Sequence, residues 1–129
     1  MEMTSYNHPF NTPEVLLKAR AKIRNKNNWC RGVYYKARGD GGLSYCAVGA
    51  IYSTENEYNK KSLCISSRAV IILNNAAHEM YQMGASDVND EKGHSAVMKV
   101  YKKAIEIAEQ EAKSVEVSEA AKIISQGNS

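Results

Sequence analysis

Residues 97–108 repeat apolar side chains with the period of an α-helix, and this pattern constrains the fold more than any other feature of the chain. The apolar residues recur three and four positions apart, at Val97, Val100, Tyr101, Ala104, Ile107 and Ala108. Residues at this spacing share one face, because an α-helix turns once every ~3.6 residues. We therefore expect a long helix that opens at His94 or Ser95 and buries this face.

Two further segments carry the same period. The first helix is expected to begin at residues 12–14, where Thr caps, Pro fits the first helical position and Glu favours the positive helix end. Its apolar stripe consists of Val15, Leu16, Ala19 and Ile23. A third helix is expected to be capped by Ser66 or Ser67 and stopped at Gly84. Its buried face would comprise Val70, Leu73, Ala77, Met80 and Tyr81.

The segment between these helices predicts a small hairpin. Residues 29–36 are rich in Val and Tyr and run into the turn formers of residues 39–42, after which residues 43–45 can return as a partner strand. Residues 46–53 are compact and rich in Ala and Gly, which predicts a short buried helix. These elements define a mainly α (α+β) fold with four to five helices and a two-stranded hairpin.

The remaining segments are expected to be connections or ends of one domain that spans residues 1–129. Polar composition predicts exposed loops at residues 55–61 and 86–93. Residues 1–11 lack periodicity and are expected to be flexible, so that the core spans residues 12–113. Val115 and Val117 are poor helix formers and Ser118 restarts a capping pattern, which predicts a separate tail helix within residues 114–129.

The number of cysteines and the hydropathy of the chain indicate its cellular location. Its three cysteines, at positions 30, 46 and 64, do not form the even set of a small secreted domain, so we expect reduced thiols. We find no signal-peptide pattern and no apolar run of about 18 residues that could span a membrane. The expected location is the cytoplasm, which would be the host cytoplasm if a phage encodes the protein.

Charge permits an anionic partner. The net charge is +3, and the first helix carries a one-signed series of basic residues, namely Lys18, Arg20, Lys22, Arg24 and Lys26. Sequence-specific DNA recognition is not expected, because no turn and reading helix follow this series and because three glutamates add negative charge to the long C-terminal helix. The histidines and cysteines show no close pairing typical of metal ligands, so neither a metal site nor a cofactor is expected.

A cysteine-dependent hydrolase or transferase is one interpretation of the remaining polar residues. Cys46 would be the nucleophile if it begins a helix, His94 the base, and Asn89 or Asp90 the group that orients the base. The alternative is that Cys46 packs as a small apolar residue, since Ala47, Gly49 and Ala50 surround it in the sequence.

A binding site is the other interpretation. Arg31 offers a planar fork for phosphate, and Trp29, Tyr34 and Tyr35 offer rings on which a base can stack. The competing view is that Trp29 anchors the core, that Arg31 is solvated, and that Asn89-Asp90 forms a turn or a cap. Eight tyrosines against one phenylalanine also favour an interface, including a homo-oligomer.

The order and spacing of three short motifs resemble a family of small uncharacterised bacterial and phage proteins. That family has a Gly-Trp, Cys-Ala-x-Gly-Ala-Leu, Trp-Asn-Asp pattern, which is matched here by Trp29, residues 46–50 and Asn89-Asp90. Asn28, Ile51 and Val88 replace the family's Gly, Leu and second Trp. The resemblance covers about residues 14 to 108 and implies that Trp29, Cys46, Asn89 and Asp90 converge, but it implies no activity.

The sequence therefore favours a non-catalytic binding protein. A phage counter-defence protein that sequesters a small anionic nucleotide-like signal, or blocks a host protein, agrees with this set of residues. Trp29, Arg31, Tyr34, Tyr35, Asn89 and Asp90 would contact the ligand. The Cys46-dependent enzyme and a purely structural or accessory interaction protein are the alternatives.

Overall fold

The computed structural model describes residues 12–58 and 67–127, with side chains at residues 12–57 and 67–114. The expectations for residues 1–11, for Cys64 and for the last two residues lie outside these ranges. The described elements are α1 (Thr12–Ile23), the single 3-10 turn η1 (Lys26–Asn28), β1 (Tyr35–Ala37), β2 (Leu43–Tyr45), α2 (Ala47–Tyr58), α3 (Arg68–Tyr81), α4 (Ala85–Glu91) and α5 (His94–Gly127). Five helices and a two-stranded antiparallel hairpin confirm the expected α+β class.

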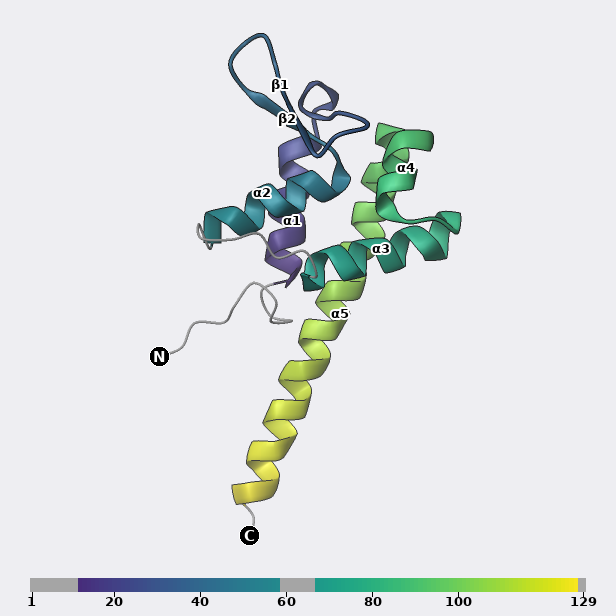
Figure 1. Cartoon of the computed structure of the whole chain (residues 1–129). Helices are drawn as coiled ribbons and strands as arrows, with labels where there is room; N and C mark the ends of the chain where they lie inside the picture. The colour runs from purple at the N-terminus through teal and green to yellow at the C-terminus, as the bar shows by residue number, and fades with distance from the viewer. Residues whose placement is uncertain (1–11, 59–66, 128–129) are drawn as a thin grey trace.

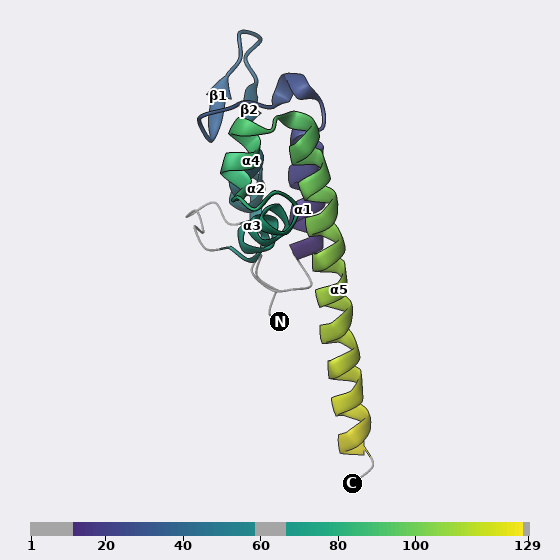
Figure 2. The same cartoon turned by 90° about the vertical axis from the view of Figure 1, so that its right-hand side faces the viewer.

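The helices surround one core. Figures 1 and 2 show α1 beside the first half of α5, with α2 and α3 lying across this pair and α4 near the hairpin, while the second half of α5 projects away. The predicted stripes supply the buried side chains: those of α1 and most of those of α5 are buried. None of the described helices combines the length and the apolar character needed to cross a lipid bilayer.

The hairpin forms where the glycine-rich turn was expected. Lys36 lies opposite Ser44 in the register, and Gly41 takes a φ of +90°, a conformation that favours glycine. Asp40 Oδ1 accepts a hydrogen bond of 2.9 Å from the Gly42 N–H, and the Arg38 guanidinium donates to Asp40 and to the Leu43 carbonyl. These contacts close the turn and set the direction of the strands.

Residues 86–93 were expected to form a loop, and this prediction is wrong because α4 occupies most of them. Gly84 begins α4 rather than ending α3, and the side chain of Asn74 accepts the Ala85 N–H at 2.8 Å. Val88 and Asn89 are buried on the inner face of α4. Tertiary burial of these residues outweighs the turn-forming composition of the segment.

Two helix boundaries also differ from the predictions. α3 ends at Tyr81, where Gln82 adopts the left-handed conformation (φ 61°) expected for a glycine, and Met80 on the predicted buried face is 39% exposed. α5 continues without a break through residues 115–118, where we expected a break before a separate tail helix. Ser67 caps α3 as predicted by accepting the Val70 N–H.

Glu55 was expected in an exposed loop, but α2 extends to Tyr58 and leaves this side chain only 1% exposed. Within the described ranges its carboxylate oxygens have no hydrogen-bond partner. Burial raises the pKa of Glu55 to about 7, and the Ser67 hydroxyl nearby opposes this rise without cancelling it.

The Glu55 carboxyl makes the stability of the fold depend on pH. Because the folded pKa lies above the unfolded value, the folded state binds the proton more tightly and loses stability as the pH rises from about 4.5 to about 7. Glu55→Gln is therefore expected to increase the free energy of unfolding at pH 8 by about 3 kcal/mol and to change it little at pH 4. Urea unfolding at both pH values measures this difference, and an equal effect at both would contradict the assignment.

Candidate functional site

Asn89 is the centre of the polar contacts between the hairpin region, α2 and α4. Its side-chain oxygen accepts hydrogen bonds from the Trp29 indole N–H at 2.6 Å and from the Ala47 backbone N–H at 2.9 Å. Its amide nitrogen donates to the Cys30 carbonyl at 3.0 Å. Asn89 is fully buried, and Ala47 and Cys30 are buried too, so removal of the Asn89 side chain would leave these two backbone groups without a hydrogen bond and with little access to water.

Asp90, the next residue of α4, holds the loop that leads into the hairpin. Its Oδ1 accepts from the backbone N–H of Gly32 at 2.9 Å and from the Asn89 amide at 3.1 Å. Gly32 has a φ of +80°, and a residue with a side chain would be strained in this backbone conformation. The carboxylate is exposed but fixed in position, which suits a group that accepts hydrogen bonds from a ligand.

The first residues of α2 are held from both sides. The Cys46 backbone N–H donates to the Tyr34 carbonyl at 3.1 Å, and the Cys46 Sγ accepts the Gly49 N–H at 3.3 Å. The buried Tyr101 hydroxyl donates to the Ala47 carbonyl at 2.6 Å. The hairpin, α2 and α5 thus meet at the start of α2.

The thiol of Cys46 is an unfavourable nucleophile in this setting. Burial raises the pKa of Cys46, the Gly49 and Val48 N–H groups only partly offset it, and Asp90 raises it further. The pKa of Cys30 is also raised, first by burial and then by the nearby Cys46. Both thiols therefore stay protonated near neutral pH.

His94, the predicted base for Cys46, has another set of neighbours. Its Nε2 lies 2.7 Å from the Ile23 carbonyl oxygen, which only accepts hydrogen bonds, so this nitrogen carries the proton. The ring packs edge-on against Trp29 with centroids 5.5 Å apart. These contacts fix His94 between α1 and the indole and give it a structural role.

Arg31 stacks on Trp29 instead of lining the pocket described next. Its guanidinium carbon lies 5.1 Å from the centroid of the indole ring, a distance at which the cation and the ring attract each other. Trp29 is partly buried, packs against the core and donates to Asn89. The indole therefore serves as an anchor, with its ring covered by Arg31 and His94.

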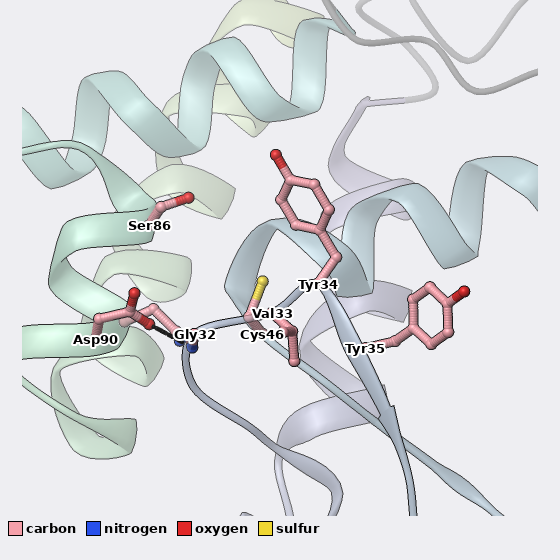
Figure 3. Close-up of a pocket in the computed structure, with 8 residues that line it drawn as sticks. Gly32, Val33, Tyr34, Tyr35, Cys46, Ser86 and Asp90 are labelled. Carbon is pink, nitrogen blue, oxygen red and sulfur yellow. Dashed lines mark hydrogen bonds between the residues drawn. The ribbon is translucent and has the colours of Figure 1, made fainter.

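A pocket of about 490 Å³ lies between the hairpin and α4. Its lining combines backbone, aromatic, thiol and carboxylate groups from Gly32, Val33, Tyr34, Tyr35, Cys46, Ser86, Asn89 and Asp90. Figure 3 shows Ser86 and Asp90 on α4 at one side, Tyr34 and Tyr35 at the other, and the Cys46 sulfur between them. Four of the six residues predicted to contact a ligand thus meet in one concave site.

The two tyrosines present large exposed rings at this pocket. Tyr34 is 55% exposed and Tyr35 is 64% exposed. Tyr52 of α2 packs edge-on against Tyr34, with ring centroids 5.4 Å apart and planes at 80°. Tyr34 is therefore oriented before any ligand arrives, which lowers the entropy cost of binding.

Sequence reasoning missed Gly32, Val33 and Ser86 as pocket residues. Ser86 was assigned to a loop, and only the recognition of α4 as a helix places Ser86 and Asp90 on successive turns of one face. Gly32 carried a signal, because a glycine between Arg31 and Val33 suggests an unusual backbone conformation. Within the described ranges, no group of histidine, cysteine and acidic residues is arranged to hold a metal ion.

These observations define a small α+β domain in which a central asparagine joins the hairpin to two helices beside an open pocket. A family model described as "Family of unknown function (DUF6197)" matches residues 8–107, and the chain belongs to this family. This confirms the resemblance to an uncharacterised family, while the bacterial or phage context stays a prediction. Comparisons with curated proteins and with solved structures gave no match.

Proposed function

We propose that the protein is a non-catalytic binding protein whose pocket between the hairpin and α4 holds a nucleotide-type ligand by its base. The juxtaposition of exposed tyrosine rings with a fixed carboxylate carries this proposal. Tyr34 supplies a π-face for stacking, and Asp90 and Ser86 face it with acceptors for the N–H groups of a base edge. The raised pKa of Cys46 supports binding over catalysis.

The charge of the pocket changes the expected binding mode. Asp90 is the charged residue of its lining, while Arg31 is engaged with Trp29. A phosphate placed against Asp90 would be repelled, so the base enters the pocket and the phosphate stays at its open side. Sequestration of a nucleotide-type signal, the counter-defence role suggested above, requires such a pocket and no reaction.

Titration calorimetry against nucleosides, cyclic nucleotides and ADP-ribose-type compounds tests this proposal. Tyr34→Ala is expected to weaken binding of the best ligand about tenfold, because stacking of one base contributes about 1–3 kcal/mol. Tyr34→Phe keeps the ring and should bind as the unmodified protein does. Asp90→Asn should also weaken binding, since the carboxylate is the stronger acceptor.

The substitution Met80→Ala provides a control, because this exposed side chain on α3 is outside the pocket lining. It should leave the affinity unchanged. Absence of binding across the whole panel, or equal losses in Tyr34→Ala and Met80→Ala, would contradict the proposal and point to a protein partner instead.

A further inference from the structure

A second concave surface, on α1 and α5, gathers basic side chains. A groove of about 430 Å³ is lined by Arg20, Arg24, Ser95, Met98, Lys99 and Lys102. Arg20 lies in the last turn of α1 and Arg24 directly follows this helix, and Lys99 and Lys102 are one turn apart on α5. Figure 2 shows that these two helices run side by side at this level. The lining shares no residue with the pocket beside the hairpin.

The four cations of this groove have no ion-pair partner among the described residues. Other basic residues nearby form ion pairs: Lys22 with Glu57, Lys18 with Glu14, and Lys103 with Glu79. In the described part of the chain, Arg20, Arg24, Lys99 and Lys102 form no ion pair. Like charges this close repel one another, and an anion between them would remove the repulsion.

Arg20 gives a second, independent sign of a ligand. Its Nε is buried and finds no hydrogen-bond partner in the described ranges. A buried N–H without an acceptor costs about 1–3 kcal/mol, so such groups are normally satisfied in folded proteins. A phosphate in the groove would satisfy this N–H once the Arg20 side chain turns Nε toward it, because a guanidinium binds phosphate with two parallel N–H groups.

The adjoining surface differs from this groove in the charge of its lining residues. A neighbouring groove shares Lys99 and Lys102, but Glu79 and Glu106 also line it and offset the positive charge. Among the described residues, none that lines the groove between α1 and α5 is acidic. The described lining also contains the Ser95 hydroxyl, which can donate to a phosphate oxygen.

We propose that the groove between α1 and α5 binds a ligand with several phosphate groups, either a free oligophosphate or the backbone of a single-stranded nucleic acid. The arginines take phosphate oxygens in pairs, and the lysines contribute point charges from the opposite wall. This site is separate from the proposed base-binding pocket and does not depend on it.

The test uses the full chain and two probes, inorganic tripolyphosphate and a short oligothymidylate. Affinity is measured by calorimetry at about 50 mM and about 200 mM salt, since binding through phosphates weakens as salt rises. The double variant Lys99→Glu/Lys102→Glu is expected to lose at least about tenfold in affinity for the probe that binds. Circular dichroism establishes that the variants fold.

A matched variant separates the groove from net charge. Lys36→Glu/Lys113→Glu changes two exposed lysines outside the groove and alters the net charge equally, so its affinity should fall much less. Tighter, strongly salt-dependent binding of oligothymidylate would identify a nucleic-acid backbone, and binding of tripolyphosphate alone a free oligophosphate. Equal losses in both variants, no binding of either probe, or binding of an acidic peptide in their place would overturn the proposal.

Discussion

Asn89→Ala is expected to lower the free energy of unfolding by about 4 kcal/mol. The substitution leaves two buried backbone groups, the Ala47 N–H and the Cys30 carbonyl, and the partly buried Trp29 indole N–H without their partner. Each unsatisfied buried group costs about 1–3 kcal/mol. Domains of this size are stable by only about 5–15 kcal/mol, so this change removes much of the total. Urea unfolding followed by circular dichroism measures the loss.

Asn74→Ala is the matched control for this experiment. The Asn74 side chain also accepts a backbone N–H, that of Ala85, but it makes this contact at a partly buried position. We expect a loss of about 1 kcal/mol, as is typical for removal of a helix cap. If the two alanine variants lose similar amounts, Asn89 does not join the three segments in the way described above.

Gly49→Ala is expected to destabilise the fold by about 3 kcal/mol and to deform the pocket. A Cβ built on Gly49 would lie 2.0 Å from the backbone oxygen of Tyr34, and backbone cannot turn aside as a flexible side chain can. Alanine is the better helix former by about 1 kcal/mol, so the steric effect must exceed this gain. Thermal unfolding measures the loss of stability, and ligand titration measures the loss of affinity caused by the deformed pocket.

Gly39→Ala controls for the loss of a glycine as such. Nothing lies within 4 Å of a Cβ at Gly39, so the change should be within about 0.5 kcal/mol. A Gly49→Ala protein as stable as the unmodified protein would show that α2 and the chain at Tyr34 are farther apart than described.

The sequence predicted those parts of the fold in which apolar periodicity and local signals agree. The stripe of α1, the Ser67 cap and the start of α5 at His94 were all expected, because each is encoded within one or two helical turns. The hairpin turn was predicted on the same grounds, since glycine permits the positive φ found at Gly41.

The elements that were missed depend on contacts far apart in the sequence. α4 is short and polar, and it is stabilised by burial of Val88 and by the bonds that Asn89 makes 42 to 60 residues away along the chain. Glu55 likewise looks solvated in the sequence but lies in the core. Local composition cannot predict such burial, because tertiary packing overrides propensity.

The sequence predicted most residues of the candidate site but not how they are arranged. Tyr34, Tyr35, Asn89 and Asp90 line one pocket, but Arg31 stacks on Trp29 and is absent from the lining. Trp29 donates a hydrogen bond to Asn89, and the Arg31 guanidinium lies over the Trp29 ring. The basic series on α1 was visible in the sequence, whereas its continuation by Lys99 and Lys102 required the packing of α5.

The most direct test of the binding-protein account is a two-dimensional ¹H–¹⁵N NMR titration with the nucleotide-type ligand that binds best by calorimetry. We predict that the largest amide shifts fall on Gly32, Val33 and Tyr34 of the loop that leads into the hairpin, on Tyr35 of β1, and on Ser86 and Asp90 of α4. The dissociation constant obtained from these shifts should agree with the calorimetric value. Shifts confined to α1 and α5, or no shift at any ligand concentration, would contradict the assignment of this pocket as the binding site.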